Sequence, residues 1–282
     1  MGQLPSYLHF NPFPGGLVPL FFLCLNFNKI YNIIYIKKGK VIIMEKEYIG
    51  RTFIKGDIHG SLTEIVDFIR KYDLRKNDNI IVLGDFGVFF ENNEIINQMK
   101  IDYYEMNCND VDLYWIDGNH ENFDLIKSWN CNKNEIYDNS NHIHYLPRGF
   151  QTFIEVDCGD HIENRKALFI GGADSVDKWW RTEHETWWAE ETITEDDIKD
   201  IKGAYYYVFS HCGPRSIVEN NKGFLYTLNN INENNSIHKS EDNLEKLKNN
   251  IIFEQWWFGH YHNDIKLNDN CRCLYKDFIE LK

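Results

Sequence analysis

Five short segments rich in Asp, Asn and His constrain the fold of this chain more than any other feature. They read GDIHG, GDFG, GNHEN, SHCG and GHYH and occupy residues 56–60, 84–87, 118–122, 210–213 and 259–262. Each follows residues typical of a β-strand and contains a glycine, which lets the backbone approach closely. One such segment is weak evidence, since Asp-x-His and His-x-His pairs also occur by chance and can be structural. Five in order predict that distant parts of the chain meet around bound metal.

The residues between these segments predict alternating strands and helices. Residues 52–55 are a short β-rich run, and the apolar runs at residues 80–83 and 113–116 are typical of buried strands. Helix patterns begin at Ser61 and near Glu94. The second half predicts strands at 143–146, 153–156, 167–170, 205–209 and 255–258, a hairpin turn at 157–160, and helix starts at Thr194 and Ser240. The expected fold class is α/β, with the polar residues at the carboxyl ends of strands, where such sheets bind ligands.

The order of the segments resembles the calcineurin-like metallophosphoesterase family, whose pattern is D-x-H, G-D, G-N-H-D/E, a single His and G-H-x-H. The similarity runs from about Thr52 to about Lys276, and residues 171–191 are similar to a segment of bacterial and phage members. The resemblance implies a four-layer sandwich of mixed α and β structure. In that sandwich, two facing mixed β-sheets are flanked by helices.

The resemblance also implies a binuclear metal site in which Asp85 bridges two ions. One ion would be completed by Asp57, His59 and His262. The other would be completed by Asn119, His211 and His260. Nitrogen and oxygen ligands without a thiolate suit manganese, iron or zinc, and manganese is preferred here. Two ions about 3.5–4 Å apart can share a bridging hydroxide that attacks phosphorus. His120, next to Asn119, is the expected general acid.

The resemblance implies a phosphoester substrate but does not identify it further. It could be a phosphorylated small molecule, a nucleotide or a phosphoprotein. Serine/threonine protein phosphatases of this superfamily continue their second motif as V-D-R-G, but here Phe86-Gly87-Val88-Phe89 follows Asp85. The phosphate-binding arginine is therefore missing. Arg181 is the predicted replacement, with Arg148 as the alternative. A protein phosphatase and a catalytically weak metal-binding scaffold stay open as other functions.

Four tryptophans in the 171–191 segment have two interpretations. Trp179, Trp180, Trp187 and Trp188 could stack on a nucleobase or pack the loop onto the domain. Packing is favoured, because large aromatic side chains dominate core burial. Cys271 and Cys273, one residue apart in an expected strand, are predicted to pack in the strand or to lie on a solvated face rather than to bind metal.

Charge and cysteine usage limit the partners and the compartment. A net charge of −13 disfavours extended duplex nucleic acid, which binds clustered Lys and Arg. Seven scattered cysteines indicate a reducing, cytoplasmic environment. No membrane is expected, because the apolar run at residues 17–25 falls short of the roughly 20 residues that span a bilayer. Residues 1–43 are predicted to be an extension outside the fold, with the domain at 44–282 and translation starting at Met44.

Overall fold

The computed structural model describes residues 18–19, 32–37, 40–45, 48–221, 223 and 238–282. The chain divides into two compact units, Met1–Ile49 and Gly50–Lys282. In the first unit, β1 (Val18–Pro19), β2 (Asn32–Lys37) and β3 (Lys40–Glu45) form an antiparallel sheet. Apart from β1, the apolar run at residues 17–25 lies outside the described residues. The proposed limits of the extension and the start at Met44 stay predictions.

The second unit contains two six-stranded mixed sheets with the same plan, four parallel strands between antiparallel edges. The first sheet has the order β15-β4-β5-β6-β8-β7. Its strands are β4 (Thr52–Lys55), β5 (Asn79–Val82), β6 (Asp112–Trp115), β7 (Tyr137–Asp138), β8 (Ile143–Tyr145) and β15 (Phe278–Glu280). The second sheet has the order β13-β14-β12-β11-β10-β9. Its strands are β9 (Phe150–Asp157), β10 (Ile162–Ile170), β11 (Gly203–Ser210), β12 (Ile251–Phe258), β13 (Ile265–Lys266) and β14 (Cys271–Cys273).

Alternate residues of the central strands supply two different cores, because successive side chains point to opposite faces of a sheet. In and just after β5, Ile80 and Val82 pack toward the helices, whereas Ile81 and Leu83 pack between the sheets. Residues such as Phe209 of β11 meet them from the second sheet. Burial on both faces explains why these strands read as continuous apolar runs.

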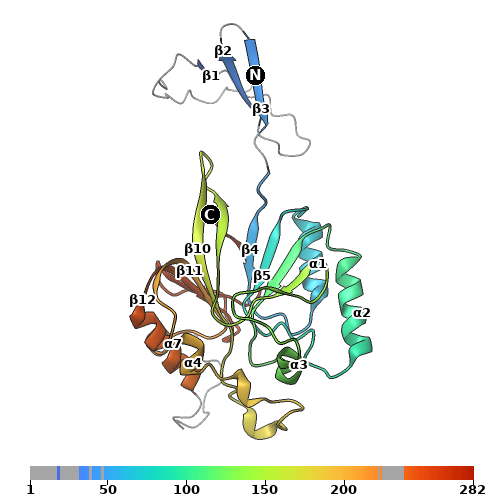
Figure 1. Ribbon diagram of the computed structural model, residues 1–282, viewed down its shortest axis with the longest axis vertical. Helices are drawn as coiled ribbons and strands as arrows, with labels where there is room; N and C mark the ends of the chain where they lie inside the picture. Colours follow the sequence, from blue (N-terminus) through green and yellow to red (C-terminus); the bar gives the residue numbers. More distant parts are fainter. Residues whose placement is uncertain (1–17, 20–31, 38–39, 46–47, 222, 224–237) are drawn as a thin grey trace. The chain divides into compact units, whose positions relative to one another are not determined.

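Helices cover the outer faces of both sheets (Figure 1). The first sheet is covered by α1 (Leu62–Lys71), α2 (Glu94–Glu105) and α3 (Phe123–Ser128). The second is covered by α4 (Glu195–Ile198), α5 (Arg215–Asn220) and α7 (Lys239–Asn250). A capping box between Thr194 and Asp197 begins α4, as its sequence predicts. The predicted four-layer sandwich is therefore confirmed.

The hairpin between β9 and β10 differs from the prediction in length. Its turn lies at the predicted place, but both strands extend beyond the apolar runs at residues 153–156 and 167–170. Polar residues such as Glu163 and Asn164 in the first half of β10 hide this from the sequence, and the hairpin projects beyond the neighbouring strands (Figure 1). Cys271 and Cys273 are buried in the helix-side core, which confirms the packing prediction.

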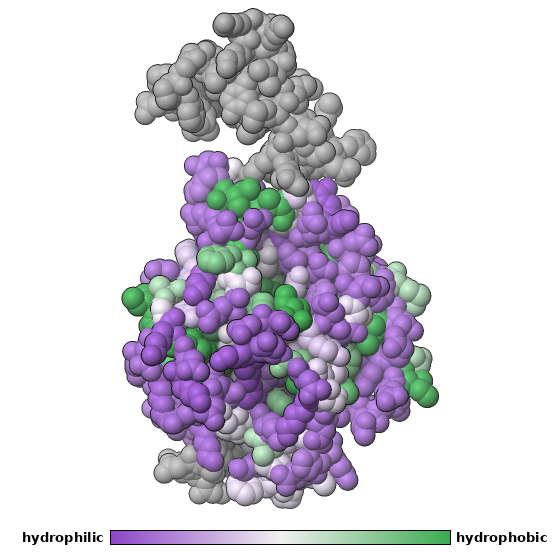
Figure 2. Space-filling view, in the orientation of Figure 1, coloured by the Kyte–Doolittle hydropathy of each residue, from purple (hydrophilic) through white to green (hydrophobic). Residues whose placement is uncertain are grey.

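The surface of the second unit is largely hydrophilic in the view of Figure 2. Within the described part of the chain, no helix combines the length and the apolar character needed to cross a membrane. The six cysteines in that part are all free thiols.

Candidate metal centre

All five polar segments lie at the carboxyl ends of parallel strands. GDIHG, GDFG and GNHEN follow β4, β5 and β6 of the first sheet, whereas SHCG and GHYH end β11 and follow β12 of the second. Because parallel strands end at a common edge, these loops converge. Hydrogen bonds join them across the two sheets, for example from the backbone N–H of His260 to Asp57 Oδ1 at 2.9 Å.

The first group of converging donors consists of Asp57, His59, Asp85 and His262, each of which has a ligand atom within 4.8 Å of the others. His262 Nε2 lies 3.1 Å from Asp57 Oδ2 and 3.0 Å from His59 Nε2. Two carboxylates and two imidazoles at this spacing match the predicted ligand set of one divalent ion.

The buried carboxylate of Asp57 tests whether a metal fits here. Its Oδ1 accepts the His260 N–H, but Oδ2 finds no hydrogen-bond donor among the residues that the structure describes. His262 Nε2 is near Oδ2 without the orientation of a hydrogen bond. Leaving a buried carboxylate oxygen unpaired is costly, so such atoms usually have a partner. A cation between Asp57 and the two imidazoles would supply that partner, and the residues therefore fit a metal.

The second group of donors surrounds the fully buried His211. His211 Nε2 lies 3.2 Å from Asn119 Oδ1, and the ring centroid of His260 lies 5.0 Å from that of His211. The carbonyl of Leu83 can only accept a hydrogen bond, so its 2.7 Å contact places the proton of His211 on Nδ1. His211 Nε2 is therefore the atom left to bind a metal, as carbonyl-oriented histidine ligands generally are.

Asp85 stands between the two groups, and its two oxygens face different partners. Oδ1 lies 3.1 Å from His211 Nε2 in the second group. Oδ2 lies 3.9 Å from His59 Nδ1 in the first group and 3.9 Å from His120 Nε2. The carboxylate thus has the orientation that a bridging ligand needs.

Several ligand residues adopt left-handed backbone conformations that residues other than glycine rarely take. The φ angles are 45° at His59, 45° at Asp85, 67° at His260 and 49° at His262. Each such residue costs on the order of 1–3 kcal/mol, and such strain concentrates at functional sites. Close packing also explains Gly118, where an added Cβ would lie 2.2 Å from Asp85 Oδ1.

The charges of this centre favour a cation. Burial opposes protonation of His211, but the adjacent Asp85 outweighs it and raises the pKa of the imidazole to about 10. Conversely, burial disfavours the Asp85 anion, but His211 holds the pKa of that carboxyl well below its usual range. Without an ion, a protonated His211 balances the buried Asp85 charge; a divalent ion bound at His211 Nε2 would replace that proton and supply the positive charge.

His120 lies at the edge of this centre and is half-buried. Its backbone N–H donates to Asp85 Oδ1 at 2.8 Å, so the main chain supports the bridge while the ring stays available. Arg181 Nη2 lies 2.9 Å from His120 Nε2, and Arg181 Nε pairs with Asp177 at 2.8 Å. The structure thus brings Arg181 to the metal centre, together with the predicted acid.

Arg148 has a different role from the one considered for it. It is largely buried and forms a 2.6 Å ion pair with the buried Asp117. Its remaining N–H groups donate to the backbone carbonyls of Thr192, Glu190 and Glu191. The guanidinium of Arg148 is thus committed to holding the loop that precedes α4.

The segment after Asp85 enters the core instead of presenting an arginine. Phe86, Val88 and Phe89 are buried against the helices of the first sheet. Glu121 is also buried and accepts hydrogen bonds from the backbone N–H of Phe86 at 2.6 Å and of Gly87 at 3.2 Å. Glu121, which was not predicted as a site residue, therefore holds the loop that carries Asp85.

The tryptophan segment divides into a packed and an exposed half. Trp188 is buried and its indole N–H donates to Asp124 at 2.8 Å, while Trp187 donates to Glu191 at 2.8 Å. The packing prediction is confirmed for these two. It is wrong for Trp179 and Trp180, which are 61% and 87% exposed.

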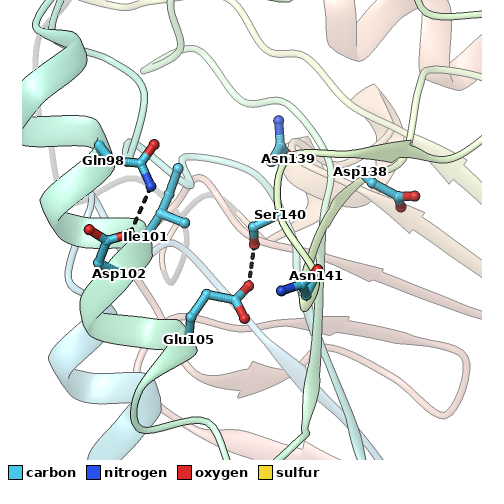
Figure 3. Close-up of a pocket in the computed structure, with 8 residues that line it drawn as sticks. All are labelled: Gln98, Ile101, Asp102, Glu105, Asp138, Asn139, Ser140 and Asn141. Carbon is cyan, nitrogen blue, oxygen red and sulfur yellow. Dashed lines mark hydrogen bonds between the residues drawn. The ribbon is translucent and has the colours of Figure 1, made fainter.

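A polar pocket of about 760 Å³ lies away from these residues, between α2 and the β7–β8 connection (Figure 3). Its lining includes two internal hydrogen bonds, from Ser140 to Glu105 and from Gln98 to Asp102. Its lining residues include none of the predicted ligands. The chemistry of the donor set, rather than pocket size, therefore identifies the candidate centre.

Comparison with known proteins agrees with this assignment. The family model described as calcineurin-like phosphoesterase matches residues 50–264, which include all five polar segments. A search of curated proteins found no match.

Proposed function

Since the chain belongs to the calcineurin-like phosphoesterase family and is a metal-dependent phosphoric ester hydrolase, we propose that its centre binds two divalent cations. The proposed ligands of the first ion are Asp57, His59, Asp85 and His262. Those of the second ion are Asp85, Asn119, His211 and His260. Manganese is the proposed metal, with iron and zinc as alternatives, because the donors are nitrogen and oxygen without thiolate.

The orientation of Asp85 carries this proposal. One carboxylate oxygen lies 3.1 Å from His211 and the other 3.9 Å from His59, so a single side chain addresses both donor groups. A site for one ion would need only one of those oxygens. Asp57 Oδ2, which accepts no hydrogen bond among the described residues, supports a cation in the first group, and the proton on His211 Nδ1 supports one in the second.

In the proposed reaction, His120 and Arg181 act on the substrate directly. The cations, when bound, would activate a water molecule as the nucleophile and neutralise charge on the phosphoryl oxygens. His120 donates a proton to the leaving-group oxygen, because its ring lies beside Asp85 at the edge of the centre. Arg181 binds the phosphoryl group, and a substrate phosphate would draw its guanidinium away from His120 Nε2.

The proposed substrates are phosphomonoesters or phosphodiesters of small molecules or nucleotides. A protein phosphatase has less support, because Phe86 and Phe89 occupy the core where that class presents its arginine. Extended duplex nucleic acid is not expected with a net charge of −13. We place the enzyme in the cytoplasm, where its free thiols would persist.

The test combines metal analysis with hydrolysis assays. After reconstitution with Mn²⁺, mass spectrometry should find two ions per chain, and the protein should hydrolyse p-nitrophenyl phosphate or its bis ester. His262→Asn should lose one ion and most activity. His184→Asn is the matched control, because His184 has a similar left-handed φ of 62° but is exposed and outside the ligand set.

Each outcome separates the alternatives. Uptake of one ion or fewer by the wild-type protein would exclude the binuclear centre. Two bound ions without hydrolysis of either ester would favour the metal-binding scaffold. Equal losses in His262→Asn and His184→Asn would show that the effect comes from the backbone and not from metal binding.

A further inference from the structure

A chain of buried hydrogen bonds leads from the loop before α4 to the amide of Asn119. Asn119 Nδ2 donates to Ser175 Oγ at 3.2 Å, and the Ser175 hydroxyl donates to Glu191 Oε2 at 2.7 Å. All three residues are at least 96% buried, with exposed fractions of 4%, 1% and 1%. Buried polar groups that are fully paired hold one arrangement strongly.

The acceptors in this chain fix the direction of every hydrogen bond. Glu191 Oε1 accepts two N–H groups, from the Ser175 backbone at 2.6 Å and the Trp187 indole at 2.8 Å. Burial raises the pKa of Glu191 to about 7, and above that pH the ionised carboxylate can only accept, so the Ser175 hydroxyl donates its one proton to Oε2. Ser175 Oγ can then only accept from Asn119, and this places the NH₂ group of the amide toward Ser175.

The direction of these hydrogen bonds determines which atom of the Asn119 amide faces the metal centre. With Nδ2 held by Ser175, the amide oxygen Oδ1 faces His211 Nε2, at 3.2 Å. Only the oxygen can ligate a cation, because the amide nitrogen of asparagine is a donor. An amide rotated by half a turn would present N–H groups to the ion.

We propose that Glu191, acting through the Ser175 hydroxyl, is a positioning residue that fixes the amide of Asn119 with its oxygen toward the second ion. The proposal rests on the binuclear function above and adds a residue that lies outside the ligand set. Outer partners of metal ligands typically contribute 10- to 100-fold to metal affinity. Arg148 strengthens the arrangement, since it donates to the Glu191 carbonyl at 3.0 Å and so holds the backbone that carries this carboxylate.

Glu191→Gln is the sharpest test, because it keeps the shape and reverses one hydrogen bond. The two N–H donors at Oε1 would select the carbonyl of the new amide, which leaves its NH₂ group facing Ser175. The Ser175 hydroxyl would then accept from Gln and donate to Asn119, and the Asn119 amide would rotate. Titration of the metal-free protein with Mn²⁺ by calorimetry should show the second ion bound about 10- to 100-fold more weakly, with the first unchanged.

Ser175→Ala and Ser175→Thr test whether the hydroxyl positions Asn119, independently of any change in charge or loss of folding. Alanine removes the acceptor without changing charge and should weaken the second ion alone, whereas threonine keeps the hydroxyl and should restore it. Thr192→Val is the matched control, because it removes a hydroxyl that donates to Asp174 at 2.7 Å on the same segment. If Glu191→Gln does not fold, the alanine and threonine pair decides the question.

The proposal is overturned if the second ion binds Ser175→Ala with wild-type affinity, or if threonine fails to restore what alanine loses. Equal weakening of both ions would also overturn it, since that indicates general loosening. These results differ from those expected if the binuclear function itself is wrong, because the wild-type protein would then bind fewer than two ions.

Discussion

Replacement of His120 by asparagine separates proton donation from metal binding. The side chain lies at the edge of the centre, with Nε2 3.9 Å from Asp85 Oδ2, but the contact that supports the bridge comes from the backbone N–H at 2.8 Å. Asparagine keeps that N–H. We therefore expect His120→Asn to bind the same number of ions as the wild-type protein.

The expected loss of turnover depends on the leaving group. Loss of a general acid costs about 10²- to 10⁴-fold, or about 2.7–5.4 kcal/mol of transition-state stabilisation. An alkyl phosphate such as glycerol phosphate needs the proton and should show this full loss. The phenolate of p-nitrophenyl phosphate leaves readily without a proton, so its hydrolysis should fall much less. The assay is kcat/KM for both substrates, with metal content measured on the same preparations and His184→Asn as the control.

Two results would refute this reasoning. Equal losses for the two substrates would show that His120 acts on something other than the leaving group. Loss of metal from His120→Asn would show that the ring, and not only the backbone, supports Asp85.

Three further predictions follow from the geometry. Dialysis against EDTA should abolish hydrolysis and added Mn²⁺ should restore it; persistent activity in a preparation shown to be metal-free would contradict metal dependence. Gly118→Ala would place a Cβ 2.2 Å from Asp85 Oδ1 and so force the Asp85 carboxylate to move. If that movement costs about 1.4 kcal/mol or more, metal binding and activity should fall more than 10-fold. Near-normal metal content would count against this packing. Arg148→Met removes the cation beside the buried Asp117, which keeps only the Tyr145 hydroxyl, and should lower the free energy of unfolding by about 3–5 kcal/mol in urea denaturation; a loss under about 1 kcal/mol would argue against the ion pair.

The positions of the candidate ligands could be predicted because each one follows a local sequence signal for the end of a strand. Asp85 follows a continuous apolar run and a glycine. This order predicts a position just after a strand, and in the structure Asp85 does follow β5. The family pattern adds what no local signal contains, namely that these five segments meet at one site. The continuous apolar runs predicted an α/β fold with buried strands such as β5, whereas the four-layer sandwich was implied by the family resemblance.

The supporting residues were less predictable, because their roles depend on contacts between distant segments. Ser175 and Glu191 are ordinary polar residues in a loop, and only the fold brings them against Asn119. Arg148 was the alternative to Arg181 as a phosphate-binding residue, and only its burial beside Asp117 separates the two structurally. For Ser175 and Glu191, the only signal in the sequence was the similarity of residues 171–191 to bacterial and phage members of the family.

In the proposed centre, the division of the ligands between two sheets would link metal supply to the lifetime of the folded chain. Asp57, His59, Asp85 and Asn119 come from loops of one sheet, and His211, His260 and His262 from loops of the other. The sheets meet mainly through side chains, so shared ions would join them at the carboxyl ends of their parallel strands. Ligand binding at 100 times the dissociation constant adds about 2.7 kcal/mol per site to stability. Scarcity of metal would thus deplete the enzyme through unfolding and proteolysis as well as silence it.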